Sequence, residues 1–169
     1  MPLVLSRSWK TACAGGLLAA AALLSGCAAP GRAAPGTTVD AALAQYGAPT
    51  ARYPLPDGQR LQYSEMPAGS NVWNLDFDTA GRLRSVDQGL RYANFNQIVL
   101  GQWTAADVER MLGRPMRVER VMSFQGPVWT YRFNDLNNFR LVHIHIDPAG
   151  IVRKIQYTDE LLFREPLGL

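Results

Sequence analysis

Most of the chain beyond residue 50 alternates between hydrophobic and polar residues, a pattern that predicts β-strands. The clearest case is 141–146, where Val142, Ile144 and Ile146 fall on one face and His143 and His145 fall on the other. Asp-x-Ala-Gly turns at 78–81 and 147–150 join consecutive antiparallel strands. Strands are predicted at 60–65, 72–77, 83–87, 118–124, 128–133, 140–146 and 151–157.

Two segments carry the signals of short helices. In the second of them, Thr104 is placed to cap the first turn, Asp107 lies near the positive helix end, and Val108 begins an apolar face. Gly113, in a left-handed conformation, and Pro115 end this helix. Helices are therefore predicted at 38–46 and 104–112, with an extra short helix at 94–99.

These signals occur twice in the same order, which indicates an internal duplication. The offset between matching residues drifts from 66 to 69 along the chain, as expected when loops differ in length. The predicted fold class is α+β, with two tandem repeats. Each repeat has one or two short helices packed on a three- to four-stranded antiparallel sheet. The repeats span 37–90 and 91–158, and a C-terminal tail spans 159–169.

The first 26 residues have the layout of a removable export signal. Arg7 and Lys10 supply a basic start, and 11–24 is almost entirely Ala, Leu and Gly. This apolar run is shorter than the roughly 20 residues that cross a bilayer comfortably. It leads through small residues into Cys27. A plain secretory signal, in which Cys27 is incidental, is the other interpretation.

The stretch Leu24-Ser25-Gly26-Cys27 resembles the lipobox of bacterial lipoproteins. The resemblance implies that the Cys27 sulfur is joined to a diacylglycerol and that the chain is cut between Gly26 and Cys27. Residues 27–36 would then be the lipidated cysteine and a flexible tether of Ala, Pro and Gly. In enteric lipoproteins an aspartate after the cysteine retains the protein in the inner membrane, so Ala28 implies transfer to the outer membrane.

Removal of the signal changes the charge and the cysteine count. The whole chain has 17 basic and 14 acidic residues, and loss of Arg7 and Lys10 leaves 15 against 14, a net charge of +1. This balance argues against a nucleic-acid partner. Cys13 also leaves, so the remaining acylated cysteine has no disulfide partner.

The two histidines are the first candidates for chemistry. His143 and His145 on one strand face are able to supply two metal ligands, but a site needs a third ligand that the sequence does not indicate. A catalytic triad would need a paired nucleophile, and no Gly-x-Ser-x-Gly motif is present. Asp76 and Asp78 lie two apart, but Asp78 is better explained by its turn. We therefore predict a non-enzyme without cofactor or metal.

Aromatic residues and arginines in the strands are the remaining candidates. Trp73, Trp129 and Tyr131, together with Arg132 and Arg140, would form a protein-binding surface if part of a sheet face is exposed. They would otherwise fill the core, as aromatic residues do in small domains. The sequence leaves both interpretations open.

Motifs in the second half resemble the SmpA/OmlA (BamE-like) lipoproteins. They are Ile98-Val99-Leu100-Gly101-Gln102-Trp103-Thr104, Asp107-Val108, Leu112-Gly113-Arg114-Pro115 and Trp129-Thr130-Tyr131-Arg132-Phe133. Known members are accessory lipoproteins of the outer-membrane β-barrel assembly machinery, with two helices on a three-stranded sheet. A tandem of this fold also builds the β-lactamase-inhibitor proteins, which bind an enzyme across a concave sheet.

The resemblance implies a lipoprotein of the Gram-negative outer membrane, held by its lipid on the periplasmic side. Its expected role is a non-catalytic protein-binding or scaffold module for other envelope proteins, in β-barrel assembly or envelope integrity. One alternative is an inhibitor or modulator of a periplasmic hydrolase. A second alternative is a small hydrolase or ligand-binding domain that uses His143 and His145.

Overall fold

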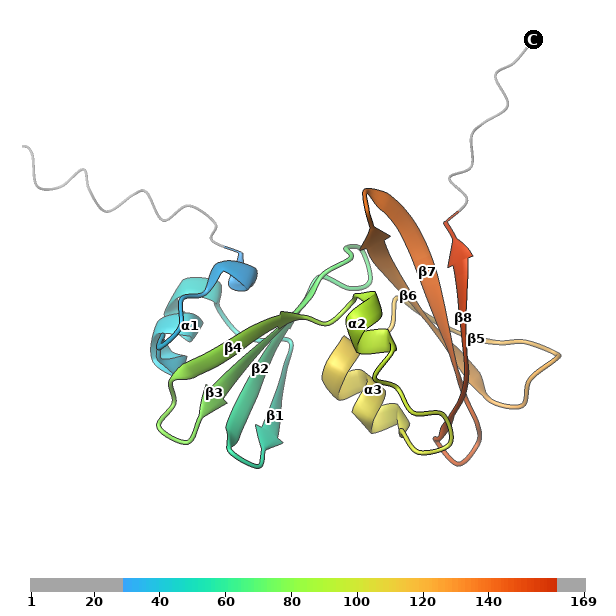
Figure 1. Cartoon of the computed structure of the whole chain (residues 1–169), viewed down its shortest axis with the longest axis horizontal. Coiled ribbons are helices and arrows are strands. Elements are labelled where there is room, and N and C mark those ends of the chain that lie inside the picture. Colours follow the sequence, from blue (N-terminus) through green and yellow to red (C-terminus); the bar gives the residue numbers. More distant parts are fainter. Residues whose placement is uncertain (1–28, 161–169) are drawn as a thin grey trace, which may run out of the picture.

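A computed structural model describes residues 29–160 and shows two four-stranded antiparallel sheets with few helices (Figure 1). In each sheet the strands lie side by side in chain order. The predicted α+β class is confirmed. Within 29–160 no helix has the length and hydropathy needed to cross a membrane. The elements are α1 (Val39–Tyr46), β1 (Ala51–Leu55), β2 (Gly58–Ser64), β3 (Val72–Asp78), β4 (Leu83–Gln88), α2 (Tyr92–Phe95), α3 (Ala105–Leu112), β5 (Arg117–Arg120), β6 (Pro127–Asp135), β7 (Asn138–Ile146) and β8 (Val152–Asp159).

The two main helices begin where their capping residues predict. The Thr104 side chain accepts a hydrogen bond from the Asp107 amide at 3.2 Å, and the Asp107 carboxylate accepts one from the Thr104 amide at 3.0 Å. This reciprocal capping box satisfies two N–H groups at the start of α3. Gly113 ends the helix with a φ of 73°.

Three elements differ from the sequence-based expectation. Strand β1 was not expected, because it contains Pro54; a proline is tolerated there because β1 is an edge strand. Strand β5 ends at Arg120, short of the expected 118–124, because the chain turns toward β6. The extra helix is α2, which begins and ends earlier than the expected 94–99.

The first sheet packs one face against α1. Its core consists of Ala42, Leu61, Tyr63, Leu75, Phe77 and Leu83. The Tyr63 hydroxyl donates a hydrogen bond to the Gly47 carbonyl oxygen at 3.2 Å, which ties the end of α1 to β2. The strand alternation therefore directs the odd-numbered residues of β2 toward α1 and the even-numbered ones toward the opposite face.

Part of the expected flexible tether is packed on the first sheet. Pro30–Arg32 forms a 3-10 helix, and a Cβ added at Gly31 would lie 2.5 Å from the Trp73 ring. The Gly36 amide donates to the Leu83 carbonyl at 2.9 Å, so the segment also bonds to β4. The expectation of flexibility to residue 36 is wrong because a residue without a side chain lets the backbone lie on the indole. Cys27 lies outside the described residues.

The second sheet packs one face against α2 and α3. Its core consists of Val72, Leu90, Phe95, Ile98, Val108, Leu112, Tyr131, Phe133, Val142, Ile144, Ile146 and Val152. Val142, Ile144 and Ile146 of β7 lie on this covered face, which confirms the predicted alternation. Val72 and Leu90 come from the first half of the chain, so the core of the second sheet extends into the first.

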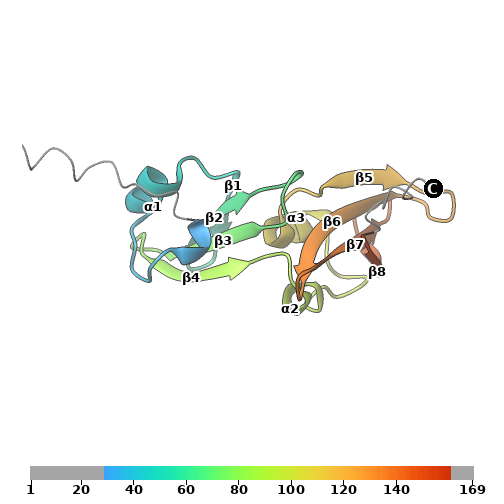
Figure 2. The same cartoon turned by 90° about the horizontal axis from the view of Figure 1, so that it is seen from above.

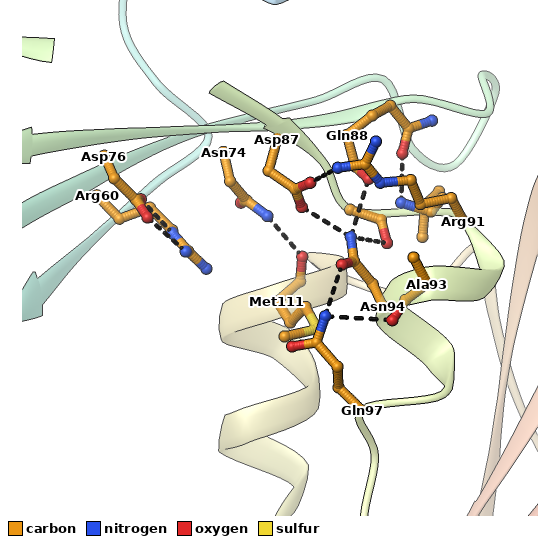
Figure 3. A network of polar contacts seen from close by, with 12 residues as sticks. Arg60, Asn74, Asp76, Asp87, Gln88, Arg91, Ala93, Asn94, Gln97 and Met111 are labelled. Atoms are coloured by element: carbon orange, nitrogen blue, oxygen red, sulfur yellow. Dashed lines mark hydrogen bonds and ion pairs between the residues drawn. The ribbon is translucent and has the colours of Figure 1, made fainter. Parts of the chain in front are cut away.

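The C-terminal end of α3 is bonded to the first sheet on the face opposite α1. The Asn74 amide donates to the Met111 carbonyl at 2.8 Å, as Figure 3 shows, and the Gln62 amide donates to the Arg110 carbonyl at 3.1 Å. These carbonyls have no partner within the helix, and both amide side chains belong to buried residues. The first sheet therefore caps the helix that covers the second, and the two sheets form one body.

Asn94 fastens α2 to the end of β4 in the same region. Its buried side-chain amide donates to the Asp87 carboxylate at 2.7 Å and to the Gln88 and Gly89 carbonyls at 3.0 and 3.1 Å (Figure 3). Burial of an amide costs free energy unless it is hydrogen bonded, so this arrangement favours one placement of α2.

Candidate binding face on the second sheet

Within residues 29–160 no helix covers the face of the second sheet opposite α2 and α3, as Figure 1 shows, although Val128, Thr130 and His145 on this face are buried. We call it the open face. Strand register places Thr130, His143 and Gln156 in one cross-strand row, and His145 and Lys154 in the next. The residues of the open face are Arg117, Glu119, Val128, Thr130, Arg132, Phe139, Leu141, His143, His145, Lys154, Gln156 and Thr158.

The two predicted histidines lie on the open face and are hydrogen bonded to its neighbouring strands. His143 Nδ1 lies 3.0 Å from Thr130 Oγ1, and its Nε2 lies 2.9 Å from Thr158 Oγ1. His145 Nε2 lies 3.0 Å from Gln156 Oε1, while the edge of the Phe124 ring covers the imidazole. These contacts hold both rings in fixed orientations across β6, β7 and β8.

Within the described residues, the hydrogen-bond partners of the two histidines are neutral side chains. No group of three His, Cys, Asp or Glu side chains there is placed to hold a metal ion. His143 is able to accept a proton from Thr158, but its other nitrogen is occupied by the Thr130 hydroxyl. A nucleophile–base pair is normally oriented by a third group, often a carboxylate, and no carboxylate within 29–160 is hydrogen bonded to either histidine.

Burial keeps both imidazoles neutral to lower pH. Desolvation lowers the pKa of His143, and the positive charges of Arg117 and His145 lower it further, against the opposing effect of Glu119. Desolvation also lowers the pKa of His145; its hydrogen bond to Gln156 opposes this shift, and Lys154 adds to it. The folded protein therefore disfavours the imidazolium form at both positions.

We predict that the free energy of unfolding falls as the pH drops below about 6.5, the pKa of an unfolded-state histidine. Below that value the unfolded chain binds protons that the folded chain binds only at lower pH, because both folded-state pKa values are lowered. Urea unfolding at pH 7.5 and 5.5 measures the loss. The double variant His143→Gln, His145→Gln should show a smaller loss over this window, and an unchanged loss would contradict the assignment.

Arg132 is the one residue of the predicted contact surface that lies on the open face. Its guanidinium lies 4.1 Å above the centre of the Phe139 ring and donates to the Glu160 carboxylate at 2.8 Å. A cation held over an aromatic ring and ion-paired at its edge loses little freedom when a partner binds. This pair forms the edge of the open face near the β6–β7 turn.

The other four predicted contact residues do not lie on this face, and the three aromatic residues among them follow the core interpretation, one of the two that the sequence leaves open. Tyr131 is fully buried, and its hydroxyl donates to the Gly113 carbonyl at 2.9 Å. Trp129 packs on the same core, and Trp73 packs on the core of the first sheet. Arg140 lies on the helix-covered side, where it contacts Tyr92, Asp135 and Asp159. Successive strand residues point to opposite faces, which separates Tyr131 from Arg132.

Sequence reasoning missed the partners of the histidines. Thr130, Gln156 and Thr158 are unremarkable strand residues until the register of β6, β7 and β8 places them beside His143 and His145. Phe124 was expected within a strand and instead reaches the His145 ring from the β5–β6 connection. The alternation of residues along each strand was sufficient to assign side chains to the two faces of the second sheet. It does not show which residues of neighbouring strands lie side by side.

Comparisons with known proteins identify no family. No protein-family model and no curated protein matches the chain. Among solved structures, the chain is similar to a DUF4309 family protein (YjgB) from Bacillus subtilis subsp. subtilis str. 168, with a TM-score of 0.32 and 16% sequence identity. The match covers 73% of this chain and 79% of that chain. A TM-score of this size assigns neither a fold nor a function.

Proposed function

We propose that the protein is a lipid-anchored binding module of the periplasmic side of the outer membrane, which holds other envelope proteins through the open face. The observation that carries this proposal is the form of that face: a broad surface of one sheet, with its polar side chains already fixed by mutual hydrogen bonds. A pre-organised surface costs little side-chain entropy on binding. Arg132 stacked on Phe139 has the composition typical of contact residues.

The proposal includes two tandem SmpA/OmlA-like repeats. Corresponding contacts in the two halves support a duplication. The Tyr63 and Tyr131 hydroxyls donate to the Gly47 and Gly113 carbonyls, at 3.2 and 2.9 Å. Isolated bridges also join the residue before each helix to the residue that follows the Asp-x-Ala-Gly turn, Thr38 to Arg82 and Thr104 to Ile151. The proposed partners are envelope proteins, and among these we expect first a component of the β-barrel assembly machinery.

Anchoring would hold the first sheet at the membrane. Packing on Trp73 begins at Pro30–Arg32, so only two residues separate Cys27 from the folded part. A segment of this length spans about 10 Å when extended. The second sheet, rigidly joined through α3, would then present its open face to partners in the same membrane at a raised effective concentration.

Site-specific photo-cross-linking in intact cells tests this function. A photoreactive amino acid replaces Lys154, which is exposed on the open face, or Asp159, another exposed residue of the same strand on the helix-covered side. We expect a cross-linked protein adduct from position 154 and little from position 159. Equal yields from the two positions, or no adduct from 154, would contradict the proposal.

A further inference from the structure

Strand β5 forms one edge of the second sheet and is exposed on both of its faces. All four of its residues are exposed, and within residues 29–160 its one neighbour in the sheet is β6. Val118 lies directly across from Trp129 and is therefore on the helix side, yet it is 56% exposed. Figure 2 shows β5 along one margin of the molecule. An edge strand of this kind is open to pairing with a further strand.

The outer edge of β5 carries backbone groups without a partner in the described part of the chain. Within residues 29–160, the backbone of 117–120 is hydrogen bonded to β6 alone. Alternate N–H and C=O groups of an edge strand point away from the sheet, so those of β5 are available to a further strand. By contrast, backbone hydrogen bonds from the segments before α1 and α3 cover the starts of β4 and β8, at Leu83 and Val152.

Two charged residues of β5 are paired with each other on the open face. Arg117 Nε lies 2.9 Å from the Glu119 carboxylate, and both side chains remain about half exposed. Successive strand residues point to opposite faces, so Val118 and Arg120 lie on the helix side. Charges on an edge strand disfavour pairing with any strand that does not present the matching charges. An occupant of this edge must therefore place an acid beside Arg117 and a base beside Glu119.

A second copy of β5 meets this requirement. Two copies joined at their outer edges in antiparallel fashion are related by a two-fold axis perpendicular to the sheet, which keeps the open faces of both copies on one side. Pairing about Val118 then sets Arg117 of each copy opposite Glu119 of the other. Opposite charges directly across a strand pair stabilise it, and the two Val118 side chains meet on the helix side.

The same charges disfavour the other registers centred within β5. Because the axis keeps each face on its own side, a residue can pair only with a residue of the same face, so the axis passes between two copies of one residue. Centring the pair on Arg117, Glu119 or Arg120 sets that residue opposite its own copy, and like charges there destabilise the pair. Centring it on Val118 sets Arg120 opposite the uncharged Met116.

We propose that the outer edge of β5 pairs with β5 of a second copy of this protein, antiparallel about Val118, so that the second sheets of the two copies become one continuous sheet. Each copy completes the backbone hydrogen bonds of the other and removes Val118 from water. The charges of β5 thereby disfavour unmatched strands and favour its own copy. This interface goes beyond the proposed function, since it requires neither the lipid anchor nor an envelope protein bound to the open face.

Sedimentation velocity of the purified protein tests the interface, at concentrations up to about 1 mM so that weak association is detected. We expect a dimer whose fraction rises with concentration, together with slower amide hydrogen exchange at 117–120. Arg117→Glu and Glu119→Arg should each weaken dimerisation about tenfold, because each sets like charges opposite one another across the pair. Arg84→Glu, at an exposed arginine of β4, should leave dimerisation unchanged.

Mixing the two charge-reversed proteins separates pairing in this register from a general loss of structure. An equimolar mixture of Arg117→Glu and Glu119→Arg has opposite charges across both pairs, so it should form a heterodimer more readily than either protein forms its own dimer. The double variant should dimerise like the wild type for the same reason. A wild type that stays monomeric, a dimer unaffected by the single variants, or a mixture no more associated than its components would overturn the proposal.

Discussion

Replacing Cys27 by alanine is expected to move the protein from the membrane fraction to the aqueous fraction almost completely. Two or more acyl chains bind a membrane stably, at about 0.8 kcal/mol for each buried CH₂ group, and the described part of the chain has no helix able to cross it. Without the thiol there is no site for the lipid. Carbonate washing of membranes followed by immunoblotting measures the distribution.

Cys13 provides the matched control, because it is the only other cysteine and lies inside the expected export signal. Cys13→Ala should leave the membrane fraction unchanged. Mass spectrometry of the N-terminal peptide should find an acylated Cys27. A Cys27→Ala protein that resists alkali washing, or an unmodified Cys27 in the wild type, would remove the anchor from the proposed function.

Substituting Gly89 by valine is expected to cost about 3 kcal/mol or more in the free energy of unfolding. A Cβ at this position would lie 2.5 Å from the Met111 carbonyl oxygen, which is backbone and cannot rotate away. The end of α3 must then move from the first sheet, which disrupts the Asn74–Met111 hydrogen bond and opens the shared core. Urea unfolding monitored by tryptophan fluorescence measures the loss.

Ser85→Val on strand β4, which ends just before Gly89, supplies the comparison, because Ser85 is exposed and its substitution should change stability by no more than about 0.5 kcal/mol. The wild type should unfold in one transition, since the two sheets share α3 and part of one core. A Gly89→Val protein as stable as the wild type, or two separate wild-type transitions, would show that the sheets are independent.

Local signals in the sequence were sufficient for α1, α3 and most strands. Thr104, Asp107 and Gly113 mark the ends of α3 through interactions within a few residues, which a sequence displays directly. Strand β7 followed from alternation in the same way. The packing of Gly31 on Trp73 could not be predicted from local signals, because it joins residues 42 positions apart and depends on the absence of a side chain.

The arrangement of the two sheets could not be predicted for a similar reason. Gln62 and Asn74 occupy positions at which an alternating strand normally faces water, and they are buried because α3 ends above them. Nothing near either residue in the chain indicates a helix end as its partner. The candidate face shows the same limit: its histidines were recognised, but their hydrogen-bond partners depend on strand register.

The most direct measurement is the identification by mass spectrometry of the protein cross-linked to position 154 in cells that make the lipidated protein. The account predicts that the cross-linked protein is an envelope protein, and we expect first a component of the β-barrel assembly machinery. A single periplasmic hydrolase cross-linked there would contradict the scaffold role and favour an inhibitor.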